Sequence, residues 1–285
     1  MKFQTLSLVV GTKACNASCP FCISKMTFLP NEKLICDSIN IRNLKKSLRL
    51  AEIGNVTTVI LTGKGETLLF PTQITTYLEE LNKFNFPFIE LQTNGKILED
   101  DSINQFLSEW AQLGLTTILI SNVGYDAELN RQIYFPNDPR WIDIEKIVNK
   151  CKSYGINARL TTMGIKGGID SPNKIKMLLS WADKLGVKQL TWRPVSHPEN
   201  TTMEWILKNS LDPSQIESIK DFVIKNGKLL YNLLHGAAVY DLFGQNFCLT
   251  NCLTIDPSEE TIRQLIFYPT GNLYTDWSLK GSILL

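Results

Sequence analysis

Short apolar runs alternate with amphipathic segments through the first two-thirds of the chain. The apolar runs predict buried strands over 6–10, 56–61, 86–91, 116–120, 157–161 and 187–192. Between them, apolar residues recur at helical spacing and predict helices over 41–51, 74–84, 103–110, 144–151 and 175–185. Six strand–helix units in succession imply an α/β fold with a parallel sheet and right-handed crossovers.

The pattern changes after Pro194. A helix is expected over 211–226 and a loop-rich stretch over 231–252. Two apolar segments, 262–268 and 272–277, then flank Pro269-Thr270-Gly271, which is a strong hairpin signal. The sequence therefore predicts a core over residues 1–195 and a small α+β appendage of helix, loop and β-hairpin over 196–285.

Composition narrows the class of protein. The chain has 285 residues, of which 44% are hydrophobic, and a formal charge of +1. The near-neutral net charge does not indicate the excess of basic residues that binding to duplex nucleic acid requires. No apolar stretch reaches the length that a transmembrane helix needs, so no membrane partner is expected. Seven cysteines without a secretion signal favour a reducing cytoplasm and thiolate ligands over disulfides.

Three of these cysteines lie within eight residues. Cys15, Cys19 and Cys22 have the spacing CxxxCxxC. A cubane iron–sulfur cluster normally takes four thiolates, so three would leave one iron open to a small molecule. The alternative is structural zinc, but zinc needs a fourth ligand and no His or Cys follows before Cys36.

The spacing resembles the signature of the radical S-adenosylmethionine (radical SAM) superfamily. This resemblance implies a partial (βα)6 barrel, a [4Fe-4S] cluster and SAM as cofactors. It further implies that the open iron chelates the amino and carboxylate groups of SAM, and that reduction releases a 5′-deoxyadenosyl radical that abstracts a substrate hydrogen atom. An external electron donor such as flavodoxin or ferredoxin would supply the electron. Phe21 matches the aromatic residue that the family places close to the adenine.

Parallel barrels carry their sites at the carboxyl ends of the strands. The second strand ends in Thr62-Gly63-Lys64-Gly65-Glu66-Thr67, which is similar to the family's Gly-Gly-Glu-Pro turn. The resemblance implies that Gly63, Gly65 and Glu66 hold the SAM ammonium. Lys64 and Thr67 depart from the family's usual glycine and proline. An ordinary turn with a solvated glutamate is the alternative.

The later strand ends supply further polar candidates, namely Asn94, Ser121, Arg159, Trp192 and Arg193. Asn94 lies in a Thr-Asn-Gly resembling that of the family and is expected to contact SAM, although Asn-Gly by itself is a turn. Ser121 is expected at the ribose or carboxylate of SAM, or as a helix cap. The cation of Arg159 needs a partner, which is either the SAM carboxylate or a structural salt bridge. Trp192 and Arg193 are expected to flank the adenine or to face the substrate.

A second cysteine pair, Cys248 and Cys252, precedes the hairpin. In some relatives such cysteines bind an auxiliary cluster, but Asp276 stands where a closing cysteine is expected. Three readings stay open: a hairpin without a cluster, a second iron–sulfur cluster with an unusual ligand, and a catalytic role in which a cysteine donates a hydrogen atom.

These features predict a radical SAM enzyme. The cysteine pair and hairpin resemble peptide maturases, which implies epimerisation, crosslinking or backbone excision of a ribosomally made peptide. Because Cys15 comes so early, a separate partner or a C-terminal surface is expected to bind any leader. The alternative substrate is a nucleotide or small metabolite whose anionic group meets Arg193, Lys64 or Lys166. A non-catalytic iron–sulfur protein is a further alternative, against which the polar strand ends argue.

Overall fold

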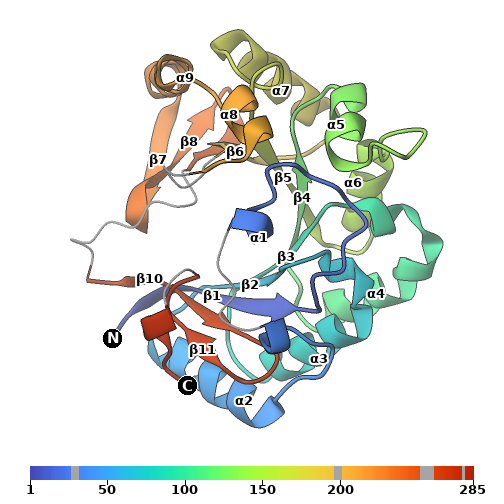
Figure 1. Ribbon diagram of the computed structural model, residues 1–285, viewed down its shortest axis with the longest axis vertical. Helices are drawn as coiled ribbons and strands as arrows, with labels where there is room; N and C mark the ends of the chain where they lie inside the picture. Colours follow the sequence, from blue (N-terminus) through green and yellow to red (C-terminus); the bar gives the residue numbers. More distant parts are fainter. Residues whose placement is uncertain (27–31, 196–200, 251–259, 278–279) are drawn as a thin grey trace.

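A computed structural model describes residues 1–26, 32–195, 201–250, 260–277 and 280–285. Its strands form one sheet in the order β11-β10-β1-β2-β3-β4-β5-β6-β9-β8-β7. The six predicted core strands are confirmed and run parallel: β1 Phe3–Val10, β2 Thr58–Gly63, β3 Phe88–Thr93, β4 Thr117–Asn122, β5 Asn157–Gly164 and β6 Gln189–Pro194. The sheet curls as a partial barrel with helices on its outer side (Figure 1).

The predicted helices between the strands are also confirmed. They are α2 Ile41–Ile53, α3 Pro71–Leu81, α4 Asn104–Gln112, α6 Ile144–Ser153 and α7 Pro172–Lys184, with α9 Pro213–Asn226 following the sixth strand. Three shorter helices were not anticipated: α1 Ile23–Met26, α5 Ala127–Tyr134 and α8 Glu204–Asn209. Among the residues that the structure describes, no helix is both long and apolar enough to span a bilayer.

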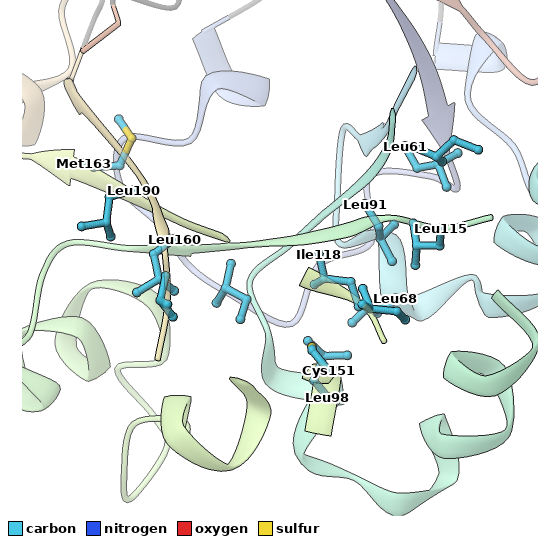
Figure 2. Packing of buried hydrophobic residues seen from close by; sticks show 14 of the residues in the cluster. Leu61, Leu68, Leu91, Leu98, Leu115, Ile118, Cys151, Leu160, Met163 and Leu190 are labelled. Carbon is cyan, nitrogen blue, oxygen red and sulfur yellow. The ribbon is translucent and has the colours of Figure 1, made fainter. Parts of the chain in front are cut away.

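The main core lies between the strands and the helices that cover them. Leu61, Leu91, Ile118, Leu160 and Leu190 come from five neighbouring strands and are at most 1% exposed (Figure 2). Each such side chain contributes roughly 1.5–3 kcal/mol when it leaves water. Because side chains alternate across a strand, the residues between them point into the barrel, and the strand ends can present polar groups there.

The interpretation of 231–252 as loop-rich is wrong. This stretch contributes to β7 Lys228–Leu233, β8 Ala237–Leu242 and β9 Gln245–Leu249. β9 pairs in parallel with β6, and β8 pairs antiparallel with both β9 and β7. The turn between β8 and β9 places Phe243 and Gly244 at positive φ, as a tight hairpin requires.

The predicted C-terminal hairpin is confirmed as β10 Ile262–Phe267 and β11 Leu273–Tyr274. β10 also pairs in parallel with β1. Strands from beyond residue 195 therefore extend the core sheet at both edges, although the proposed division of the chain at that residue remains a prediction.

Candidate active site at the cysteine loop

Residues 11–22, here called the cysteine loop, follow β1 and lie against the ends of β2 and β3. The backbone amide of Glu66 donates to the carbonyl oxygen of Ala14 across 2.9 Å. The side-chain amide of Asn94 donates to Oδ1 of Asn16 across 2.7 Å. Two strand ends that the sequence predicted to form one site thus hold the same loop.

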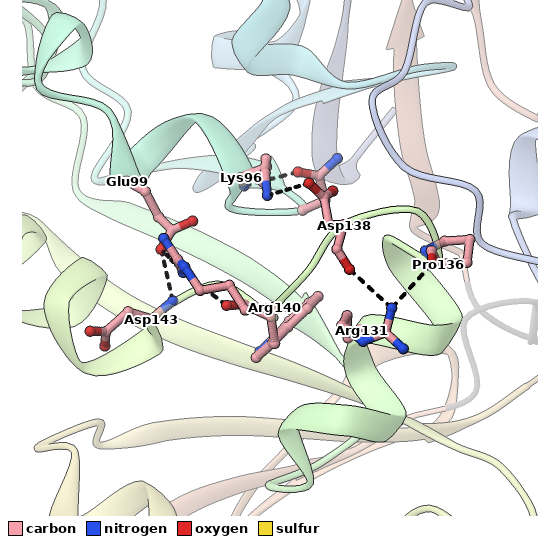
Figure 3. A network of polar contacts seen from close by, with 9 residues as sticks. Lys96, Glu99, Arg131, Pro136, Asp138, Arg140 and Asp143 are labelled. Carbon is pink, nitrogen blue, oxygen red and sulfur yellow. Dashed lines mark hydrogen bonds and ion pairs between the residues drawn. The ribbon is translucent and has the colours of Figure 1, made fainter.

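A third contact comes from the end of α5. The amide of Ser18 donates to the carbonyl oxygen of Tyr134 across 2.8 Å. The segment after α5 is held in turn, because Arg131 donates to the carbonyl oxygens of Pro136 and Asp138, and Lys96 pairs with Asp138 at 3.1 Å (Figure 3). The cysteine loop is therefore fixed from three elements that are far apart in sequence.

The cysteine loop carries three thiols, on Cys15, Cys19 and Cys22. Among the described residues, no three His, Cys, Asp or Glu side chains are close enough to hold one metal ion. Thiols that ligate different irons of a cubane stand further apart than the ligands of one zinc ion. Burial, together with the neighbouring charge of Cys22, raises the pKa of Cys19 to about 12. Iron must therefore displace a proton there when it binds.

The turn after β2 fits the cysteine loop because it lacks a side chain. A Cβ added at Gly65 would collide with the carbonyl group of Ala14. Gly63, two residues earlier, lines the neighbouring cavity. The three thiols of one loop, and a glycine turn that brings backbone groups against that loop, are a donor set suited to a [4Fe-4S] cluster and SAM.

The carboxylate of Glu66 bonds to groups of the protein itself. One carboxylate oxygen accepts from the hydroxyl of Thr93 at 2.5 Å and from the amide of Leu68 at 3.0 Å, and the other accepts from the amide of Asn94 at 2.9 Å. Burial raises the pKa of this carboxyl, while the hydrogen bonds act in the opposite direction. The side chain joins the ends of β2 and β3, and its contact with the SAM ammonium remains a prediction.

A cavity of about 450 Å³ opens at the carboxyl ends of the core strands. From the cysteine loop, Cys19, Phe21 and Cys22 line it. Ser121, Met163 and Arg193 line it from β4, β5 and β6. This volume is in the range of small-molecule and cofactor sites. Six of the predicted site residues meet here: Cys19, Cys22, Phe21, Gly63, Ser121 and Arg193.

Arg159 and Trp192 do not line this cavity. Arg159 forms an ion pair with Glu90 at 2.9 Å and also donates to the hydroxyl of Thr191. This is the structural salt bridge that the sequence left as one of two readings. Trp192 is 1% exposed and donates from Nε1 to the carbonyl oxygen of Ile169.

Cys248 lies on β9, in register with Thr191 of β6, and is buried. Burial raises the pKa of its thiol, while the charge of Arg159 acts to lower it. Cys252 lies outside the described residues. The three roles considered for this pair remain predictions.

Two further side chains line the cavity: Lys64, which the sequence offered only as a contact for an anionic substrate, and Tyr134, which it did not offer. Lys64 lines the cavity with its ammonium 5.0 Å from the centre of the Trp277 ring, and burial lowers the pKa of the amine to about 8. Tyr134 also lines the cavity, from the end of α5, a helix that the sequence pattern did not predict. The cap at Asp126, which accepts from the amide of Leu129, was the signal that could have found this helix.

The sequence matches the family model of the radical SAM superfamily over residues 9–182, and the chain belongs to this superfamily. Among curated proteins, none matches.

Several solved radical SAM structures share the fold. SuiB of Streptococcus suis, solved with S-adenosylmethionine, has a TM-score of 0.59 at 17% identity, covering 96% of this chain and 60% of that one. anSMEcpe with bound AdoMet and Kp18Cys peptide has a TM-score of 0.55 at 13% identity, covering 79% of this chain and 60% of that one. Coproporphyrinogen III oxidase (HemN) of Escherichia coli has a TM-score of 0.52 at 14% identity, covering 80% of this chain and 54% of that one. This chain thus spans about three-fifths of the length of SuiB.

Proposed function

We propose that the chain holds a [4Fe-4S] cluster through Cys15, Cys19 and Cys22 and binds SAM against it. When bound, these groups supply a 5′-deoxyadenosyl radical for hydrogen-atom abstraction from a substrate. The observation that carries the proposal is the fixing of one cysteine loop by the ends of β2, β3 and α5. This arrangement presents two of the three thiols to a cavity large enough for a cofactor.

The chain's own residues would bind and orient SAM and keep water from it. Phe21 offers an aromatic face on the cavity wall for the adenine, and its position is fixed by packing against Tyr134 and Trp205. Ser121 offers a hydroxyl to the ribose at the end of β4. Met163 and Val195 provide apolar wall that excludes water.

The substrate class is the finer part of the proposal, and we favour a peptide. Its support is the shared fold with anSMEcpe, which was solved with a peptide bound. Coproporphyrinogen III oxidase has the same fold, so a small metabolite is the second candidate, and the cations of Lys64 and Arg193 on the cavity wall favour it. We propose a flavodoxin or ferredoxin as the electron donor and the reducing cytoplasm as the compartment, which suits cysteines that act as thiolate ligands.

The activity is tested by reconstituting the cluster without oxygen, adding SAM and dithionite, and measuring 5′-deoxyadenosine. We expect product in proportion to the cluster content. An intact cluster that forms none would favour the non-catalytic alternative. If a short reading frame lies beside the gene, adding the peptide that it encodes is expected to increase product, and the peptide is expected to appear modified by mass spectrometry. Stimulation by a metabolite alone would favour the second candidate.

A further inference from the structure

Four polar, uncharged side chains line the cavity from neighbouring strands. Ser7 of β1, Thr62 of β2, Gln92 of β3 and Gln264 of β10 are here called the polar wall. The cavity residues of β4, β5 and β6 come from the other half of the sheet. No SAM contact proposed above uses any of the four side chains, so their role is still to be explained.

Strand pairing places the polar wall on one face of the sheet. Gln264 is in register with Thr5, whose side chain points to the same side as that of Ser7 two residues later. Ser7 is in register with Ile60, which shares its face with Thr62. Ile60 also lines the cavity and adds an apolar surface between the two hydroxyls. The wall is therefore continuous from β10 to β2.

The carboxamide of Gln92 extends this wall and is held in one orientation. Its Oε1 accepts from the hydroxyl of Thr62 at 3.1 Å, and its Nε2 donates to Glu90 at 3.1 Å. A carboxamide has two N–H groups and two lone pairs, so each end of Gln92 can make a second hydrogen bond. Gln92 therefore offers the cavity both a donor and an acceptor.

Ser7 and Gln264 carry hydrogen-bonding groups that the fold does not use. Neither the hydroxyl of Ser7 nor the carboxamide of Gln264 makes a hydrogen bond within the described part of the chain. Ser7 is 4% exposed, in the middle of a strand whose neighbouring positions are apolar. A residue that breaks the local pattern without a structural return is typical of a binding site.

We propose that the polar wall binds the side-chain carboxamide of an Asn or Gln residue in a substrate peptide. This group offers two N–H donors and an acceptor oxygen, which match the mixed donors and acceptors of Ser7, Gln92 and Gln264. Its methylene stem can pack against Ile60. The inference rests on the proposed function, which supplies the peptide and places SAM at the cysteine loop.

A charged or an apolar side chain fits the polar wall less well. Glu90, below Gln92, is already paired with Arg159 at 2.9 Å. Arg263 shares the outer face of β10 with the core residue Leu265. A charge at the polar wall would therefore lose its water without gaining a counterion there. An apolar side chain would exclude water and leave the polar groups of the wall without partners.

The test uses the reconstituted enzyme, immobilised without oxygen in the presence of SAM. It is offered an equimolar mixture of three pentapeptide pools with identical flanks and blocked termini, whose central residue is Asn or Gln, Asp or Glu, and Leu or Met. We expect at least fivefold enrichment of the amide pool over each of the others. Gln92→Met and Ser7→Ala are each expected to reduce this preference to below twofold, with the Kd for SAM changed less than twofold.

Ser7→Ala also separates binding from a structural role. Because its hydroxyl makes no hydrogen bond in the protein, the free energy of unfolding should not fall in this variant. Gln132→Met is the matched control for Gln92→Met, because it removes a carboxamide from an exposed residue of α5 that bonds to Glu128. The control is expected to keep the full preference for the amide pool.

Equal retention of the three pools, or retention of none, would overturn the inference. Enrichment of the acidic pool would do so as well, since it assigns the substrate contact to Lys64 or Arg193. So would a tenfold loss of SAM affinity in Gln92→Met with an unchanged peptide preference. Formation of 5′-deoxyadenosine by the unsubstituted enzyme persists if this inference alone is wrong and is absent if the proposed function is wrong.

Discussion

The amide of Glu66 donates to the carbonyl oxygen of Ala14 across 2.9 Å, and this bond fastens the end of β2 to the cysteine loop. It is possible only because the preceding residue, Gly65, has no side chain to separate the two backbones. The position of the three thiols relative to the sheet therefore depends on a glycine that is more than forty residues away in sequence from all of them.

Gly65→Ala is expected to lower cluster content sharply. The new Cβ meets backbone atoms of Lys13 and Ala14, which cannot move aside as the end of a flexible side chain can. Iron analysis after anaerobic reconstitution should fall from about four to below one per chain, with the circular dichroism of the fold retained. Gly281→Ala is the control, because nothing lies within 4 Å of a Cβ added there. A full iron complement in Gly65→Ala would contradict this account of the loop.

Arg159→Met separates the two roles that the sequence allowed for this arginine. The substitution leaves the carboxylate of Glu90, which is 6% exposed, without its cation. We expect the free energy of unfolding to fall by about 2 kcal/mol, less than for a fully buried pair because Arg159 is partly exposed. The Kd for SAM should stay unchanged. The double variant Glu90→Gln, Arg159→Met should regain part of the stability. A tenfold loss of SAM affinity with unchanged stability would instead support the SAM-carboxylate role.

The second cysteine pair is tested by counting iron. If Cys248 and Cys252 bind no cluster, replacing both by alanine leaves about four irons per chain, the content of one cubane. A fall from about eight to about four would establish an auxiliary cluster. If iron is unchanged but the substrate-derived product is lost while 5′-deoxyadenosine still forms, the pair acts after hydrogen abstraction.

Lys64 is expected to become nucleophilic at unusually low pH. Burial disfavours its ammonium and brings the pKa from the ordinary 10.5 to about 8, while the charge of Cys22 opposes this shift. The amine is therefore protonated and unreactive below about pH 8 and reactive above it. Competitive acetylation of the cluster-free protein, with an N-acetyl-lysine amide standard, should give a midpoint near 8. Bound cluster adds negative charge and should move it upward. A midpoint at the ordinary value would show that the ammonium is not desolvated.

The sequence predicted the six core strands and their helices because the buried positions are apolar, in short runs for the strands and at helical spacing for the helices. It failed at α5, where a buried polar residue, Asn130, takes the place of an apolar one and bonds to backbone atoms of Val123 and Gly124. It failed also at β7, all of whose residues are exposed, so that no alternation of burial marks the strand. Both α5 and β7 are held in place by contacts with other parts of the chain, which the pattern of residues within each element does not show.

The residues of the candidate site also fall into those that the sequence could predict and those that it could not. Polar residues at the ends of parallel strands could be placed together, because those ends share one edge of the sheet. The partner of Arg159 could not be chosen, since Glu90 lies 69 positions away and only the fold brings the two charges together. Tyr134 was missed because its place at the cavity follows from α5.

The central claim is that three thiolates leave an iron open to SAM, and electron paramagnetic resonance of the dithionite-reduced protein tests it most directly. We predict the signal of a reduced cubane that changes shape when SAM is added, and no such signal in Cys19→Ala. A cubane spectrum that SAM leaves unchanged, or an unaltered cluster in Cys19→Ala, would contradict the account.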